Sequence, residues 1–437
     1  MYLPKTLPFD LKNSFIMNII KTLFLSALTS MASLQAMADG PFRQHRYDAL
    51  NVLPVTESNI VFIGNSITNM HEWWEAFDNP QVINRGVSGA VSDELVANLS
   101  PILSGHPAKA FLMIGTNDLG TAGIDNAPHV AKNVRTVLER FRRESPTTKV
   151  YVQSILPSRR RNLALQRITN DSLRHICQEM GVEYIDLWDD LLSVSTDNQH
   201  TLDGLHLQAS GYRVWCRRIA PLVGSACIYP REFSDRSSGL YYSNGMRATQ
   251  FDVLPVRDGD VLMIGDEMVH SGEWHELLHS DRVRSRSIGW GYPGIDIRGI
   301  AGCLDAIFHG RPNNGTPSKA FFYVGEADLW DKGEVSEIAE RYAAMLDKAH
   351  RLSPATKLVV GTLLPTGNDN MDKERITRFN QALKTLADER KFVSVIDLHA
   401  ALSTDGKPNP TYMQGAYVSG KGYLRLAEVL RPVLLGK

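Results

Sequence analysis

Short segments from the first half of this chain return in the second half in the same order, and this internal repeat constrains the fold more than any other feature. Asn51-Val-Leu-Pro-Val55 returns 201 positions later as Asp252-Val-Leu-Pro-Val256. Ala110-Phe-Leu-Met-Ile-Gly115 returns 210 positions later as Ala320-Phe-Phe-Tyr-Val-Gly325. Because the matches keep their order along the chain, they indicate two copies of one domain.

A polar, turn-rich segment at 229–243 separates the two copies. We therefore expect a first domain over residues 39–230 and a second over 231–437. The second copy should pack on the first, and association of whole chains into a homo-oligomer stays open.

The N-terminal residues resemble a bacterial signal peptide rather than part of a fold. Lys21 precedes an apolar run at 22–28, and Ala36-Met37-Ala38 has the small-residue spacing of a signal peptidase site. We expect residues 1–38 to be this signal, with Met17 as an alternative start. The mature protein would then be periplasmic or secreted.

Composition excludes several classes of protein. A formal net charge of −1 provides no attractive field for nucleic acid, and no apolar run is long enough to span a bilayer. The four cysteines have neither a metal-ligand spacing nor a disulfide framework, although one bridge between Cys216 and Cys227 stays open. We expect no cofactor and no metal.

Each copy alternates short apolar runs with amphipathic stretches. This pattern predicts an α/β fold in which a mostly parallel, five-stranded sheet lies between helices. In the first copy the expected strands are at 59–64, 81–84, 108–115, 149–155 and 183–186, and the expected helices at 93–103, 127–143, 164–180 and 212–222.

A serine follows the first strand at once. The apolar run ends at Gly64, and Ser66 then stands at the carboxyl end of the strand, where a following helix would aim free N–H groups at it. Open α/β sheets place ligands and chemistry at that edge. Taken alone, Asn65 and Ser66 could equally be an ordinary helix cap.

Residues near the ends of other elements could complete a catalytic site. Asp203 and His206 lie three positions apart before the last helix, a spacing that lets the carboxylate orient the imidazole while the imidazole faces a serine. Asn117 follows the third strand, and Gly86 follows the second, where its N–H could approach a ligand. Together with the N–H of Ser66 they could stabilise an oxyanion.

These four blocks resemble the SGNH (GDSL-like) hydrolase family, particularly members similar to platelet-activating-factor acetylhydrolase. The matching segments are Gly64-Asn-Ser-Ile-Thr68, Asn84-Arg-Gly86, Gly115-Thr-Asn117 and Asp203-Gly-Leu-His206.

The resemblance implies two tandem three-layer, flavodoxin-like domains and ester hydrolysis without a metal. It implies Ser66 as nucleophile, His206 as base and Asp203 as its orienting acid, with an oxyanion hole from Ser66, Gly86 and Asn117. One departure is Asn65, where the family usually has aspartate; this puts tuning of the site in doubt more than activity.

The second copy keeps the scaffold glycines and loses the catalytic side chains. Ser66 corresponds to Glu267, Asn117 to Ala327, Asp203 to Gln414 and His206 to Tyr417. We therefore expect no triad catalysis from it. It could be structural, as a covalent mimic of a homodimer, or it could bind sugars. The aromatic candidates for sugar stacking are Trp274, Trp290, Tyr292, Trp330 and Tyr417.

The substrate is the least constrained feature. We expect an exported serine esterase acting on short-chain, chiefly acetyl, esters of carbohydrates. Trp74 could line the pocket, and Arg159 could meet a carboxylated sugar, although a basic cluster is more often a solvated loop. The alternatives are a lysophospholipase or thioesterase acting on longer acyl chains, and a glycan-binding protein without catalysis.

Overall fold

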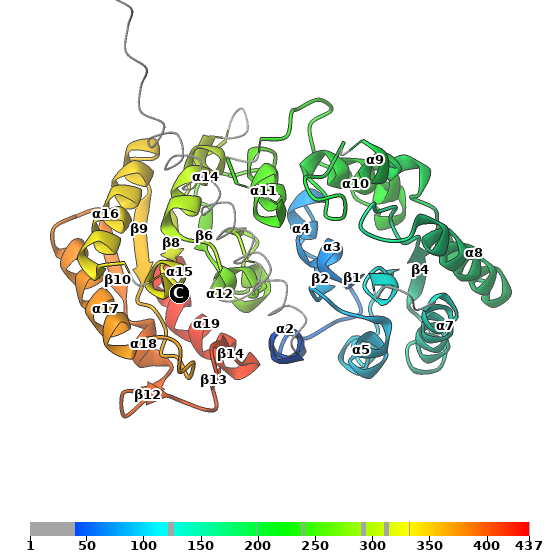
Figure 1. Ribbon diagram of the computed structural model, residues 1–437, viewed down its shortest axis with the longest axis horizontal. Helices are drawn as coiled ribbons and strands as arrows, with labels where there is room; N and C mark the ends of the chain where they lie inside the picture. Colours follow the sequence, from blue (N-terminus) through cyan, green and yellow to red (C-terminus); the bar gives the residue numbers. More distant parts are fainter. Residues whose placement is uncertain are drawn as a thin grey trace, which may run out of the picture.

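The computed structural model describes residues 40–120, 126–197, 199–236, 239–240, 242–289, 294–309, 314–331 and 333–436. The expected signal peptide lies outside these ranges, as do Trp290 and Tyr292. The protein contains two five-stranded sheets, side by side, with helices on both faces of each (Figure 1).

The first copy closely follows the predicted order. Its strands are β1 (Ile60–Gly64), β2 (Val82–Gly86), β3 (Lys109–Met113), β4 (Lys149–Gln153) and β5 (Glu183–Ile185). Its main helices are α3 (Ser66–Asn69), α4 (Trp73–Ala76), α5 (Ser92–Ala97), α6 (Ser100–Leu103), α7 (Ala127–Glu144), α8 (Leu163–Met180) and α10 (Ala209–Val223). The single helix expected at 93–103 is two helices, because Pro101 lies in the first turn of α6 and starts a new helix there.

The second copy repeats this architecture. Its sheet contains β6 (Val261–Gly265), β7 (Val283–Ser287), β8 (Lys319–Tyr323), β9 (Lys357–Gly361) and β10 (Val393–Ile396). Its main helices are α12 (Glu267–His270), α13 (Trp274–Leu277), α14 (Ile297–His309), α15 (Glu326–Trp330), α16 (Val335–Leu352), α17 (Lys373–Asp388), α18 (Leu398–Ala401) and α19 (Gly420–Leu435). Two short hairpins precede α19, formed by β11 (Ser403–Thr404) with β12 (Lys407–Pro408) and by β13 (Met413–Gln414) with β14 (Tyr417–Val418).

Both sheets are parallel throughout. The strand order is β2-β1-β3-β4-β5 in the first and β10-β9-β8-β6-β7 in the second. Every residue of β1 is buried, which fits a central strand covered on both faces. On one face Phe62 stacks on Trp73 and Phe111, with ring centroids 4.1 and 4.9 Å away.

The register places the carboxyl ends of three strands at one edge. Gly64 at the end of β1 pairs with Gly86 of β2 and with Met113 of β3. The segments that leave these strands, which carry Ser66 and Asn117, therefore start from the same edge of the sheet. This is the edge where the sequence predicts the site.

In each copy, a helix that precedes the first strand packs against the other copy. Helix α2 (Gly40–Asn51) packs on α19 and β14 of the second copy. Helix α11 (Tyr242–Thr249), followed by η3 (Gln250–Asp252), packs on α10 of the first copy. Both helices lie between the two sheets in Figure 1.

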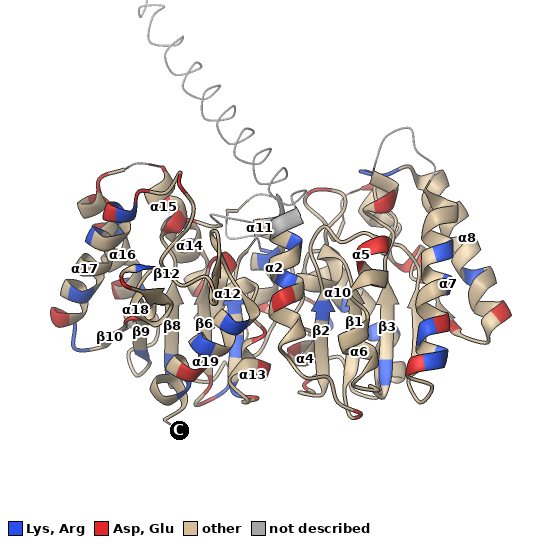
Figure 2. Ribbon diagram, turned by 90° about the horizontal axis from the view of Figure 1, so that it is seen from below, with Lys and Arg blue, Asp and Glu red and all other residues tan. Residues whose placement is uncertain are grey.

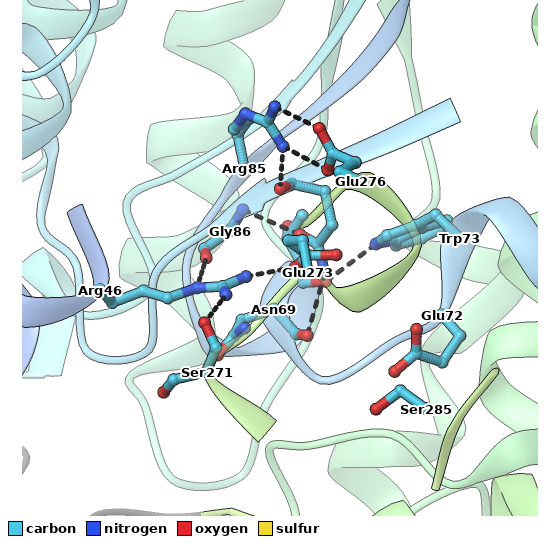
Figure 3. A network of polar contacts seen from close by, with 12 residues as sticks. Arg46, Asn69, Glu72, Trp73, Arg85, Gly86, Ser271, Glu273, Glu276 and Ser285 are labelled. Carbon is cyan, nitrogen blue, oxygen red and sulfur yellow. Dashed lines mark hydrogen bonds and ion pairs between the residues drawn. The ribbon is translucent and has the colours of Figure 1, made fainter. Parts of the chain in front are cut away.

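Buried ion pairs join the copies, and they come in symmetric sets. Arg85 of β2 donates to Glu276 of α13 at 2.9 and 2.7 Å (Figure 3), and Arg286 of β7 donates twice to Glu75 of α4 at 3.0 Å. The members of one pair lie 201 positions from those of the other. The contact thus has the two-fold character of a homodimer interface.

All four cysteines are free, so the disulfide left open between Cys216 and Cys227 is not formed.

The charged side chains on the surface form no large patch of one sign. Basic and acidic side chains are mixed over the outer helices of both copies (Figure 2), in keeping with the near-zero net charge.

Candidate active site

Ser66 is the first residue of α3 and stands directly beyond the end of β1. The preceding Asn65 caps the helix, since its Oδ1 accepts a hydrogen bond from the N–H of Ile67 at 3.0 Å. Gly64 is required just before it, because a Cβ there would lie 2.2 Å from Thr68 Oγ1 and 2.5 Å from the Met113 carbonyl. This tight turn holds Ser66 with only 5% of its surface exposed.

The structure brings Ser66, His206 and Asp203 together. Ser66 Oγ lies 3.0 Å from His206 Nε2, and His206 Nδ1 lies 2.8 Å from Asp203 Oδ2. The other carboxylate oxygen of Asp203 accepts the backbone N–H groups of Leu205 and His206, each at 2.9 Å. The three side chains thus form a continuous hydrogen-bonded chain, a geometry in which a base can activate a serine.

Asp203 is held ionised by its surroundings. Burial alone would raise the pKa of its carboxyl group, but the charge and hydrogen bonds of His206, with the N–H of Leu205, outweigh burial and hold that pKa well below the ordinary range. Asp203 can therefore accept the Nδ1–H of His206 and leave Nε2 to face the serine.

Two of the three predicted oxyanion donors are placed near this edge. Within the described chain, the N–H of Ser66 has no hydrogen-bond partner. The side-chain amide of Asn117 donates to the carbonyl of Ala90 at 2.9 Å, which anchors Asn117 against the loop that follows β2. Each amide nitrogen carries two protons, so Asn117 keeps one for a ligand.

Gly86 is not available as the third donor. Its N–H donates to Asn84 Oδ1 at 2.9 Å, and its place in β2 is tightly covered by α3, because a Cβ would lie 2.4 Å from the Asn69 nitrogen. Gly86 is thus needed for packing rather than for donation.

Gly89, three residues further on, differs from Gly86 in having a backbone N–H that is not already used. It is half-buried, has a left-handed φ of +80°, and its N–H has no partner within the described chain. It directly precedes Ala90, to which Asn117 is anchored. The sequence segment Asn84-Arg-Gly-Val-Ser-Gly89 holds two glycines, and only the backbone geometry distinguishes them.

Trp74 does not line the pocket. It is 4% exposed, stacks on His275 of the second copy with ring centroids 4.9 Å apart, and lies under the Arg284 guanidinium. It therefore belongs to the contact between the copies, and the assignment to substrate binding is wrong.

The arginine cluster after β4 does lie beside the proposed triad. Arg159 is exposed, and its Cγ and Nε lie 2.3 Å from where a Cβ of Gly204 would be. Arg160 is 3.4 Å from Asp203 Oδ2, and Arg161 donates to the Thr116 carbonyl at 2.8 Å. The cluster thus spans from the Asp203 loop to the segment that carries Asn117.

The equivalent edge of the second copy has a different chemistry. Glu267 occupies the position of Ser66 and accepts a hydrogen bond from Ser271 at 2.5 Å, while Tyr417 stacks on His45 of α2. Burial, together with the charge of Glu267, raises the pKa of Glu326 to about 7 although the Tyr323 hydroxyl opposes the shift. Within the described residues, no serine, histidine and aspartate are linked there by hydrogen bonds as Ser66, His206 and Asp203 are, since Ser271 donates to Glu267 and not to a histidine.

The three described members of the aromatic set expected to stack on sugars, Trp274, Trp330 and Tyr417, lie on different elements. Trp274 is buried and donates to the Val269 carbonyl at 2.7 Å, and Tyr417 packs on α2, whereas Trp330 is exposed. These residues form no common platform.

One group of acidic and histidine side chains, Glu273, His275 and Glu276, is compact enough for a metal ion in the part of the chain that the structure describes. Its carboxylates are already neutralised, since Glu273 pairs with Arg46 at 2.6 Å and Glu276 with Arg85 (Figure 3). The group therefore does not fit a cation site.

Comparison with known proteins agrees with this reading of the fold. The model of the GDSL-like lipase/acylhydrolase family matches residues 62–214 and again 264–425, which is more than half of the chain. No curated protein matches. The chain is a carboxylic ester hydrolase by class. It belongs to the GDSL-like lipase/acylhydrolase family, and the predicted tandem repeat is confirmed.

Solved structures similar to this chain include three esterases or lipases. A GDSL-like lipase from Bacteroides thetaiotaomicron is 24% identical, with 41% of this chain and 96% of that chain covered and a TM-score of 0.35. Axe2, an acetylxylan esterase from Geobacillus stearothermophilus, is 15% identical, with 40% and 99% covered and a TM-score of 0.34. A carbohydrate esterase family 3 protein from Talaromyces cellulolyticus is 19% identical, with 38% and 96% covered and a TM-score of 0.32.

Among the described residues, no helix combines the length and apolar character needed to cross a membrane.

Proposed function

We propose that the first copy, residues 39–230, hydrolyses short-chain esters through Ser66, His206 and Asp203. The observation that carries the proposal is the continuous chain of two hydrogen bonds, 3.0 Å from Ser66 to His206 and 2.8 Å from His206 to Asp203. A serine hydroxyl needs such a base within hydrogen-bonding reach to become nucleophilic.

In this mechanism, His206 takes the Ser66 proton as Oγ attacks the ester carbonyl carbon. The carbonyl electrons move onto its oxygen, where the N–H groups of Ser66 and Gly89 and the amide of Asn117 stabilise the charge. Collapse breaks the bond to the alcohol, which leaves with the proton from His206. Water, activated by the same histidine, then releases the acid from Ser66.

The proposed substrate is an acetyl ester of a carbohydrate met outside the cytoplasm. Export is supported by the sequence pattern of residues 1–38. The exposed Arg159 beside Gly204 favours an alcohol that carries a negative charge, such as a carboxylated sugar, because a guanidinium binds carboxylate with two parallel hydrogen bonds.

The second copy, residues 231–437, is proposed to be catalytically inactive. Tyr417 stands at the position of the base His206, so Glu267 has no histidine base there. Ala327 stands at the position of Asn117 and has no side-chain amide. It acts as the structural partner of the first copy, in the manner of a homodimer joined in one chain.

The test is hydrolysis of p-nitrophenyl acetate, butyrate and octanoate by the mature protein. Ser66→Ala should abolish turnover, and the matched change Glu267→Ala should leave it intact. Acetate should be the best of the three esters. Preference for octanoate would favour a lipid acylhydrolase, and turnover by Ser66→Ala equal to wild type would overturn the proposed triad.

The role of Arg159 is tested with a matched pair of acetylated sugars, one neutral and one carrying a carboxylate. Arg159→Gln should raise KM for the charged sugar by about tenfold and leave the neutral one unchanged. Equal effects on both sugars would remove the anionic substrate from the proposal.

A further inference from the structure

Helix α11 leads into the second copy but contacts the first copy on both sides of the proposed triad. It and the adjoining η3 reach the end of the Ser66 helix at one side and the loop of Asp203 and His206 at the other. Met246, Arg247, Thr249 and Gln250 make these contacts, and all four are buried.

On the nucleophile side, two side chains hold one carbonyl. Arg247 Nη1 donates to the Met70 carbonyl at 3.0 Å, and Gln250 Nε2 donates to the same oxygen at 2.8 Å. Met70 is the residue at which α3, the helix that begins with Ser66, ends. Gln250 Oε1 also lies 2.9 Å from Nδ1 of the neighbouring His71.

On the base side, Thr249 caps the start of α10 beside Asp235, whose Oδ1 accepts the N–H of Ser210 at 3.0 Å. The capping residue of α10, Gln208, makes no side-chain hydrogen bond to the helix, and the N–H of Ala209 donates instead to Thr249 Oγ1 at 2.8 Å. Ala209 comes three residues after His206.

Met246 reaches the start of the same loop. Its sulfur accepts a hydrogen bond from Thr201 Oγ1 at 3.7 Å, and that hydroxyl oxygen accepts the N–H of Gly204 at 2.9 Å. The loop from Thr201 to Ala209 is thus held at both ends by α11.

We infer that α11 and η3 fix the position of His206 relative to Ser66, so that the second copy is a working part of the esterase. The inference rests on the proposed triad. Thr249 and Gln250 are positioning residues that act through the backbone at Ala209 and Met70. A serine and its base must stay within hydrogen-bonding reach, and small displacements at this distance cost large factors in rate.

The first copy makes two equivalent contacts with the second copy, and these provide an internal control. In α2, Asp48 accepts the N–H of Gly420, the first residue of α19, at 2.7 Å, as Thr249 does for Ala209. Arg46 donates to the Ser271 carbonyl at 2.6 Å, as Arg247 does to Met70 (Figure 3). The contacts of α2 hold a copy without a triad, whereas those of α11 hold the copy with one.

The contact that Gln250 of η3 makes has no counterpart. The position equivalent to Gln250 is Ala49, which cannot donate to a carbonyl. The second bond to the Met70 carbonyl is therefore present only on the side of the proposed active site.

The experiment compares Thr249→Val and Asp48→Val in the full mature chain on p-nitrophenyl acetate. Both changes remove one cap between the copies, and both should lower the melting temperature. Thr249→Val should lower kcat by about tenfold with KM within twofold, whereas Asp48→Val should leave kcat unchanged. Thr249→Ser, which keeps the hydroxyl, should restore kcat.

Equal kcat values for Thr249→Val, Asp48→Val and wild type would overturn the inference while leaving the triad in place. Loss of kcat in Asp48→Val as large as in Thr249→Val would also overturn it, because the effect would then be one of general stability. Failure of the proposed function would be separate, since wild type would then match Ser66→Ala.

If Thr249→Val does not fold, Gln250→Met provides the second measurement. It removes the bond to Met70 and keeps the volume. It should lower kcat and slow the labelling of Ser66 by a neutral fluorophosphonate by similar factors, because both reactions need the same serine and base. Unchanged labelling would contradict the inference.

Discussion

The two copies share a scaffold and an interface but differ at the same edge of their sheets. In the first copy, the position after the first strand carries Ser66 within 3.0 Å of His206; in the second it carries Glu267 near the ionisable Glu326. The residues that join the copies are paired across the repeat, as Arg85 with Glu276 and Arg286 with Glu75.

This contrast indicates that contact and chemistry are separable within one fold. Trp74 stacks on His275, its own counterpart 201 positions later, so this pair lies where a symmetry axis of a dimer would pass. An interface of this kind is self-complementary and needs both halves. Catalytic side chains are needed at only one of the two sheet edges, which leaves the side chains at the corresponding edge of the second copy free to change.

The largest expected difference between the copies is in catalysis. Asp203→Asn should lower kcat on p-nitrophenyl acetate by about 10³–10⁴, because an amide cannot hold His206 in the required tautomer. The matched change Gln414→Ala in the second copy should leave kcat unchanged. Comparable losses in both variants would contradict the division into an active and an inactive copy.

The sequence predicted the parts of this site that depend on local pattern. An apolar strand that ends at Gly64 fixes where Ser66 lies, and the spacing of Asp203 and His206 fixes how they meet. Both are short-range consequences of parallel strands and tight turns. The parallel sheet followed from the alternation of apolar runs with amphipathic stretches, and the two copies followed from the internal repeat, whereas the order of the strands came from the structure.

What the sequence did not reveal depends on long-range contacts. Gly86 and Gly89 look alike in sequence, and they differ only because Gly86 is under α3 and Gly89 has a left-handed backbone. Trp74 was assigned to the pocket because it closely follows Ser66, yet it faces the other copy. No short sequence pattern indicates that α2 packs on the second copy and α11 on the first.

The next largest effect should be on stability at the interface. Glu75 is completely buried and faces both Arg286, at 3.0 Å, and Arg284, at 3.7 Å, so Glu75→Gln leaves a buried positive charge unpaired. We expect a loss of about 3–5 kcal/mol in the free energy of unfolding.

Glu276→Gln tests the symmetry of this contact. Glu276 faces Arg85 and its side chain keeps 11% exposure, so the loss should be smaller, about 1–3 kcal/mol. Urea unfolding of both variants measures the difference. A larger loss in the free energy of unfolding for Glu276→Gln than for Glu75→Gln would show that burial does not determine how much each ion pair contributes to stability.

A smaller effect, in the pH dependence of stability, should distinguish the second copy, which we propose to be inactive. The folded state raises the pKa of Glu326 from 4.5 to about 7, so its contribution to stability is complete below pH 4.5 and is lost as the pH rises to about 7. Glu326→Gln cannot ionise. Its melting temperature relative to wild type should therefore rise between pH 5 and pH 8, by about 2–4 °C.

Glu337→Gln, an exposed change on α16, is the control for this measurement. Its difference from wild type should stay constant over the same pH range. A constant difference for Glu326→Gln as well would mean that the Glu326 carboxyl is ionised in the folded state well below pH 7.

The smallest change in stability is expected at Asn65, the residue before Ser66, whose counterpart in the second copy is Asp266, the residue before Glu267. Asn65 caps α3 through Oδ1 at 3.0 Å from the Ile67 nitrogen, and Asp266 caps α12 in the same way at 3.3 Å from the Met268 nitrogen. The two side chains have the same shape, and in each the second polar atom, Asn65 Nδ2 or Asp266 Oδ2, is buried without a hydrogen-bond partner among the described residues. Asn65→Asp should therefore keep the turn and the cap.

We expect Asn65→Asp to change the free energy of unfolding by less than about 0.5 kcal/mol at pH 5. The pKa of Asp266 is raised well above its ordinary value, chiefly by burial, so an aspartate at the matching position of the first copy would also tend to stay protonated at that pH. Turnover of the variant at pH 5 and pH 8 measures the effect of this aspartate on catalysis. A change in kcat that appears only at pH 8 would show that the neutral side chain of Asn65 matters to Ser66, and that the two copies differ in charge as well as in catalytic residues.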